Sequence, residues 1–239
     1  PIAKYNKLNK VTGIHAKEIV FPSEVQYMQP LTATCETVTI KSGVTGITNL
    51  TKLTGVETLN VESGANVPSL AGSATLKNIN IDSGAKISAT GLFKNCTALE
   101  EAKVHAEIPN NAFDNCSNLG SIDLSNIKSI GSYAFRKTGL SDISIPTNCT
   151  VSSNAFREIA SPLTVYYDGK SLGMSAFSSD IFNELRLGPN ASGINHSAFY
   201  NAVIHRLYID PANTACYSTN RENLFVRSDN GDDQVYPYQ

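Results

Sequence analysis

The 239-residue chain contains no tryptophan, only two methionines, and charged side chains at just 17% of its positions. It has no apolar run approaching the roughly 20 residues that a membrane-spanning helix needs. The net charge of −2 is small, and Lys and Arg are scattered rather than clustered. A basic surface is what attracts proteins to phosphate backbones. We therefore expect neither a nucleic-acid partner nor a transmembrane segment.

Sequence motifs for catalysis or metal binding are also missing. The four histidines, His15, His105, His196 and His205, have no ligand-like spacing to another His, Cys or carboxylate. The five cysteines include no CxxC pair. The one GxSxG string, at residues 169–173, falls within the repeat and is interpreted as part of it, and no phosphate-binding glycine loop occurs. We expect no enzyme, no catalytic residue, no cofactor and no metal.

One acidic loop, residues 229–233, leaves two interpretations open. Its carboxylates suit Ca²⁺, which prefers several oxygen ligands in a flexible loop. The Asn230-Gly231 pair, however, lies between two apolar stretches, which is a strong signal for the turn of a β-hairpin. The hairpin interpretation is favoured because the loop lacks the distant bidentate Glu of an EF-hand.

A repeat dominates what is present. Ten short segments end in an apolar triplet spaced i, i+3, i+5, and their ends recur every 19 to 23 residues. The last positions are Phe21, Ile40, Val61, Ile81, Val104, Leu124, Ile145, Tyr167, Leu187 and Ile209. The positions five residues earlier are Ala16, Cys35, Val56, Leu76, Leu99, Leu119, Leu140, Pro162, Phe182 and Ile204. Alternation of this kind predicts half-buried strands, and the long connections predict that the strands pair in parallel.

A second recurrent motif lies between the predicted strands. Each copy ends in Ala-Phe, at Phe113, Phe135, Phe156, Phe177 and Phe199, with Phe93 in a weaker relative. We expect each Phe to fill the core opposite the sheet, with the small Ala in a short helical or 3₁₀ turn capped by the preceding Asn or Ser. Cys96 and Cys116 occupy one position of adjacent repeats. They are expected to pack as buried thiols, although a disulfide between them stays open.

These residues carry a resemblance to a known family. The unit from Ile130 to Pro146, with Ala134-Phe135, Leu140 and Ile143, resembles the leucine-rich repeats of BspA-type bacterial surface proteins. The tail from Asn213 to Pro237 is similar to the hairpin that often closes such arrays. Residues 90–238 match well, whereas residues 16–90 match only in the strand positions. The early segments have Ser-Gly turns at Ser42, Ser63 and Ser83 in place of Ala-Phe.

The repeat and the resemblance together predict one domain: a right-handed leucine-rich-repeat solenoid. A parallel sheet forms its concave face, short helical turns lie opposite, and a β-hairpin caps the C-terminal end. Residues 1–15 would form an N-terminal cap, 16–212 about ten repeats and 213–239 the hairpin cap. The resemblance also implies an extracellular or cell-surface location, with the leader absent from this chain.

The outward positions of the predicted sheet suggest a binding surface. Near the C-terminal end they become aromatic and charged: Tyr166, Arg186, Tyr208, Arg206 and Glu184. Tyr and Arg are favoured binding anchors, although the same residues would also suit an ordinary polar sheet face.

The resemblance implies a monomeric adhesion module, without enzymatic activity, that recognises a host or neighbouring-cell protein, of the extracellular matrix or the cell surface. Two alternatives stay open. One is a glycan-binding or glycan-active protein in which Asp142 and Glu184 would do acid–base chemistry. The other is a structural spacer without a ligand.

Overall fold

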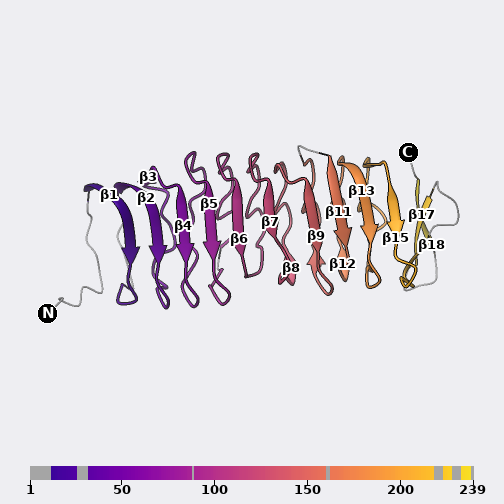
Figure 1. The fold of residues 1–239 in the computed structure, drawn as a ribbon, viewed down its shortest axis with the longest axis horizontal. Coiled ribbons are helices and arrows are strands. Elements are labelled where there is room, and N and C mark those ends of the chain that lie inside the picture. Colours follow the sequence, from indigo (N-terminus) through magenta and orange to yellow (C-terminus); the bar gives the residue numbers. More distant parts are fainter. Residues whose placement is uncertain are drawn as a thin grey trace.

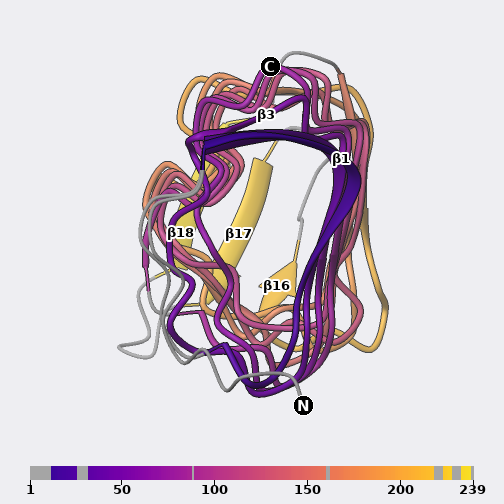
Figure 2. The same cartoon turned by 90° about the vertical axis from the view of Figure 1, so that its left-hand side faces the viewer.

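The computed structural model describes residues 12–25, 32–87, 89–159, 162–217, 223–227 and 233–237. Each rung of the structure contributes one strand to a long parallel array (Figure 1). In chain order these strands are β1 (Thr12–Phe21), β2 (Thr32–Ile40), β4 (Thr58–Val61), β5 (Asn78–Ile81), β6 (Glu101–Val104), β7 (Ser121–Asp123), β9 (Asp142–Ile145), β11 (Leu163–Tyr167), β13 (Ile181–Leu187) and β15 (Leu207–Ile209). Seen down the long axis, the coils superpose closely (Figure 2), so the stack runs almost straight.

The register confirms the predicted ladders. Phe21 pairs with Ile40, Ile40 with Val61, and Val61 with Ile81. Further along, Tyr167 pairs with both Ile145 and Leu187. The aligned apolar side chains are buried. The fold is therefore a parallel β-solenoid of the leucine-rich-repeat kind, and the short strands β3 (Leu53–Thr54) and β14 (Val203–Ile204) extend the same sheets.

The strand array consists of two sheets that meet between β7 and β9. Strands β1 to β7 form the first, and β9, β11, β13, β14 and β15 form the second. Strand β7 ends early because Ser125 donates its N–H to the Asp123 carboxylate at 2.9 Å, which turns the chain. Leu124 lies directly after the strand and is still buried, so the core continues across the break.

One apolar position differs from the prediction. Leu163, not Pro162, pairs with Phe182 and is buried, because Asn183 is an extra residue between the pairs Leu163–Phe182 and Thr164–Glu184. Such an extra residue is a β-bulge, which bends the strand and re-aims the side chains beside it.

The sequence analysis missed a second ladder. Strands β8 (Ser129–Ile130), β10 (Thr150–Val151) and β12 (Ser171–Leu172) form a three-stranded parallel sheet. Single bridges extend it to Ile108 at one end and Ile194 at the other. The rungs from Ile108 to Ile194 are thus hydrogen-bonded to their neighbours at two places around the coil.

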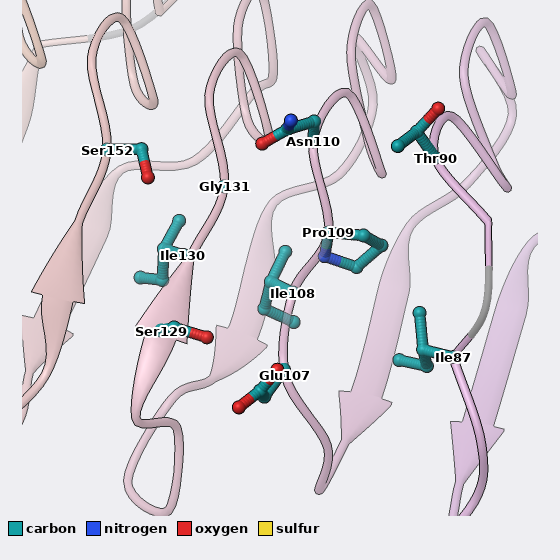
Figure 3. Close-up of a pocket in the computed structure, with 10 residues that line it drawn as sticks. All are labelled: Ile87, Thr90, Glu107, Ile108, Pro109, Asn110, Ser129, Ile130, Gly131 and Ser152. Atoms are coloured by element: carbon teal, nitrogen blue, oxygen red, sulfur yellow. The ribbon is translucent and has the colours of Figure 1, made fainter.

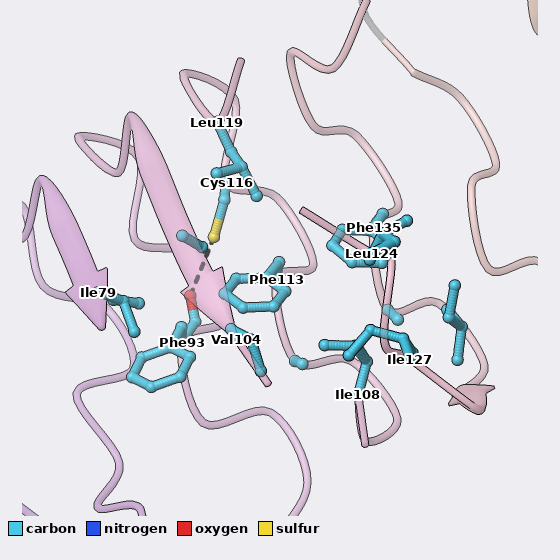
Figure 4. Packing of buried hydrophobic residues seen from close by; sticks show 14 of the residues in the cluster. Ile79, Phe93, Val104, Ile108, Phe113, Cys116, Leu119, Leu124, Ile127 and Phe135 are labelled. Atoms are coloured by element: carbon cyan, nitrogen blue, oxygen red, sulfur yellow. Dashed lines mark hydrogen bonds between the residues drawn. The ribbon is translucent and has the colours of Figure 1, made fainter. Parts of the chain in front are cut away.

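The phenylalanines stack through the core, as predicted. The rings of Phe93, Phe113, Phe135, Phe156 and Phe177 lie 4.8 to 5.6 Å apart in sequence, with interplanar angles of 5° to 19°. Figure 4 shows part of this column, with the Cys116 thiol donating to the Phe93 carbonyl at 3.1 Å. All five cysteines are free and buried, Cys96 and Cys116 included.

The turns that carry these rings are not helical. In the part of the chain that the structure describes, no helix is assigned. Each turn has a left-handed residue two positions before Phe and another two positions after it, as at Asn111 (φ 56°) and Asn115 (φ 63°) around Phe113. Left-handed residues interrupt a right-handed helix, and Asn tolerates them well. Asn111 therefore shapes the turn through its backbone instead of capping a helix.

The N-terminal rungs turn on glycine instead. Gly43, Gly64 and Gly84 have φ of 77° to 82°, and each follows a serine. Neighbouring turns stack, since Ser42 donates its hydroxyl to the Ser63 carbonyl at 2.8 Å. The sequence has no Phe between Phe21 and Phe93, so these turns place no ring in the core.

At the C-terminal end, β16 (Cys216–Tyr217), β17 (Asn223–Arg227) and β18 (Asp233–Pro237) form an antiparallel sheet, which confirms a β-hairpin in the tail. The acidic residues 229–232 of the proposed calcium loop lie outside the described residues, as do residues 1–11 of the predicted N-terminal cap.

Candidate binding surface on the parallel sheet

The three outermost strands at the C-terminal end align the predicted residues. Tyr166 on β11 pairs with Arg186 on β13, and Arg186 pairs with Tyr208 on β15. Adjacent strands lie about 4.8 Å apart. The two tyrosines therefore flank the arginine in one row, as the sequence predicts.

Glu184 connects the arginines of this row. Its carboxylate contacts the Nε of Arg186 on the same strand, and its other oxygen lies 3.8 Å from the Nε of Arg206. The hydrogen bond from Arg186 holds the pKa of Glu184 below its usual range, and the same contact raises the pKa of Arg186. Glu184 follows the bulge at Asn183, so the bulge sets where this carboxylate lies.

The aromatic rings are open to solvent. Tyr166 is 39% exposed and Tyr208 51% exposed, both unusual for large apolar side chains in this chain. The guanidinium of Arg186 lies 5.9 Å from the centroid of the Tyr208 ring, within the range of a cation–π contact. Arg206 is the most exposed of the group, with 74% of its side chain accessible.

A buried network supports Tyr166 from below. Asp168, which directly follows the last residue of β11, is 5% exposed and accepts hydrogen bonds from the N–H and the Nδ2 of Asn190 at 2.7 and 2.9 Å. Thr147 also donates to it. Gly188 leaves room for this arrangement, because a Cβ there would lie 2.4 Å from the Asp168 carboxylate and 2.5 Å from the Tyr166 hydroxyl. The sequence analysis did not identify this support.

The ion pairs of this surface do not favour acid–base chemistry at Glu184. A general acid needs a raised pKa, whereas the ion pairs lower the pKa of Glu184. Asp142 lies two strands away, on the far side of Thr164, and its carboxylate accepts the Ser141 hydroxyl at 2.8 Å. Half-exposed Tyr and Arg side chains instead offer area and hydrogen-bonding groups to a partner.

The N-terminal part of the same face is organised differently. Here short polar side chains bond to one another across strands. Asn80 donates to Asn60 at 2.8 Å, Asn60 to Thr39 at 3.5 Å, and Thr39 to Glu18 at 2.9 Å. Their hydrogen-bonding groups are used within the sheet, so little is left for a partner.

Comparison with known proteins agrees with the repeat. Residues 49–162 match the model of the BspA type leucine rich repeat region, in six copies. No curated protein matches the chain. Among the described residues, no helix is long and apolar enough to cross a membrane. Repeats of this kind indicate a protein-interaction or surface repeat module, and the scaffold is typically non-enzymatic. Residues 49–162 are therefore a BspA-type leucine-rich-repeat region, and the strand ladder of this region continues on either side of it.

Proposed function

We propose that this protein is an adhesion module, located outside the cell, that binds a protein ligand of a host or neighbouring cell through the row Tyr166, Arg186 and Tyr208. The observation that carries the proposal is this row itself: two half-exposed tyrosines flank an arginine on neighbouring strands. Glu184 and Arg206 complete the contact surface at one side of the row.

The mechanism is surface complementarity on a rigid frame. Both strand ladders fix the backbone of the rungs that carry Tyr166 and Arg186, so these side chains lose little further freedom when a partner binds. Tyr and Arg bury large areas while keeping polar groups paired, and a few such anchors supply most of the energy of a typical interface. Arg206 is held only loosely in the free protein, which leaves its guanidinium available for a carboxylate of the partner.

The test is binding of the purified chain to a panel of extracellular-matrix proteins by surface plasmon resonance. For a protein that binds, Tyr166→Ala, Arg186→Ala and Tyr208→Ala should each weaken the affinity by about tenfold or more, as expected for hot-spot residues. The matched controls are Asn60→Ala and Lys103→Ala, in the same outward column on β4 and β6. Equal effects of the two sets, or none from the first, would refute the proposed surface.

A further inference from the structure

The second ladder follows one hydrogen-bonding rule along most of its length. Each rung contributes one apolar residue to this ladder: Ile108, Ile130, Val151, Leu172 and Ile194. The residue directly after it donates its N–H to the carbonyl of the ladder residue in the preceding rung. Gly131 donates to Ile108 at 2.8 Å and Ser152 donates to Ile130 at 2.9 Å. In the same way, Gly173 donates to Val151 at 2.8 Å, and Asn195 to Leu172 at 2.9 Å.

Pro109 breaks this rule at the rung of Ile108. It occupies the position of Gly131, Ser152 and Gly173, but proline has no N–H to donate. Across the gap lies Ile87, whose carbonyl accepts no hydrogen bond from any described residue. The ladder hydrogen bond is missing at this point, and a pocket of about 320 Å³ lies beside Pro109, lined by residues of this rung and of the rungs on either side (Figure 3).

The pocket combines an apolar floor with a polar rim. Ile87 and Pro109, both partly exposed, supply carbon surface, while Glu107, Asn110 and Ser152 supply polar groups (Figure 3). The Asn110 Oδ1 accepts the N–H of Ser132 at 2.8 Å, and its Nδ2 has no partner in the described part of the chain. The carboxylate of Glu107 is exposed and likewise has no ion-pair partner there.

We propose that this pocket binds one sugar ring of a glycan. A pyranose presents C–H groups on its faces and hydroxyl groups at its edge, which matches carbon on the floor and amide, carboxylate and hydroxyl groups on the rim. The volume lies at the lower end for small-molecule sites, as one ring requires. Since no Lys, Arg or His lines the pocket, phosphorylated or sulfated ligands have no counter-charge there.

Titration of the ¹⁵N-labelled full chain with glucose, galactose, mannose and N-acetylglucosamine tests the proposal. At least one sugar should shift the amide signals of Gly91, Gly131 and Ser132 with a dissociation constant near millimolar. Glu107→Ala should weaken this binding about tenfold, as loss of a charged hydrogen-bond acceptor does. Ser152→Trp should fill the pocket and abolish it.

Ser117→Trp is the matched control, because Ser117 is exposed and does not line the pocket. It should leave the titration unchanged, and thermal unfolding should show that all three variants are folded. The proposal is wrong if none of the sugars shifts these amide signals even at sugar concentrations far above millimolar. It is also wrong if the Ser152→Trp variant binds sugar as the parent does. Shifts with free arginine but with no sugar would assign the pocket to a cationic side chain and overturn the proposal. The protein-binding row on the main sheet is independent of either result.

Discussion

The N-terminal and C-terminal rungs share one strand ladder but fill its interior in different ways. From β2 to β5 the coils turn on Ser-Gly pairs, and their core is aliphatic, as at Leu59 and Ile79. From residue 91 onward the coils turn on left-handed Asn, Ser or other residues, and a column of stacked Phe rings runs through the core. The same strand ladder accommodates both kinds of core, because most residues of the aligned triplets are buried in both halves.

The outer face differs in the same direction. In the N-terminal half, the Asn and Thr side chains satisfy one another across the strands. In the C-terminal half, Tyr166 and Tyr208 remain half-exposed. The proposed function therefore assigns the contact surface to the C-terminal rungs and a scaffold role to the N-terminal rungs.

The largest loss of stability should come from removing one ring of the stacked Phe column. Phe135→Ala removes a side chain that is fully buried between Phe113 and Phe156. We expect a loss of about 3–5 kcal/mol in the free energy of unfolding, measured by urea denaturation. Phe135→Leu keeps most of the volume and should cost clearly less. If the two variants lose the same amount, the column is not stabilised by ring packing.

A second effect should depend on pH and arises from Asp180, three residues after Phe177. In the preceding rungs the residue three positions after Phe is Cys116, Thr138 or Ile159, and each is buried. Asp180 places a carboxyl group at the same buried position. Burial raises its pKa to about 8, opposed by the hydrogen bond from the Ile159 N–H at 2.7 Å. Nearby, Glu158 raises the pKa further and Arg157 lowers it.

The direction of this pH dependence follows from the number of protons that the folded and unfolded states bind. Unfolded Asp titrates near pH 4, so between about pH 4 and pH 8 the folded state holds one more proton than the unfolded state. The contribution of Asp180 to the free energy of unfolding should therefore fall by up to about 1.4 kcal/mol per pH unit across this window. Asp180→Asn should remove that slope. Parallel stability profiles of parent and variant from pH 4 to 8 would show that Asp180 is not buried as an acid.

The smallest changes in stability should distinguish the N-terminal turns, which use glycine, from the C-terminal turns, which place other residues in the left-handed conformation. Gly64→Ala places a side chain at φ 77°, and we expect a loss of about 1–2 kcal/mol. Lys137 already has φ 58°, so Lys137→Gly should be neutral or stabilising by up to about 1 kcal/mol. Thermal unfolding of both variants measures the difference. A destabilised Lys137→Gly variant would mean that the lysine side chain contributes more than its backbone strain removes.

The sequence predicted the strand ladder well, because the triplet at Ile143 and Ile145 repeats with the two-residue period of a half-buried strand. It also predicted which face Tyr166 and Arg186 share. The second ladder was missed because a strand as short as Thr150–Val151 leaves no period to detect.

The left-handed turns and the bulge could not be predicted from the sequence, because contacts between neighbouring rungs determine them. Tyr133 and Glu158 adopt left-handed conformations that their residue types do not favour, so stacking against neighbouring rungs imposes them. The bulge at Asn183 depends on how β13 meets β11, which a single strand sequence does not encode. The pocket at Pro109 depends on which hydrogen bonds join neighbouring rungs, and the sequence of one repeat does not encode these bonds.

Hydrogen–deuterium exchange with and without a bound partner tests the central claim most directly. The partner would be any matrix protein that the surface plasmon resonance panel identifies. Binding should slow exchange at β11, β13 and β15 and leave β2, β4 and β5 unchanged. Protection confined to the N-terminal strands, or binding to no member of the panel, would contradict the account.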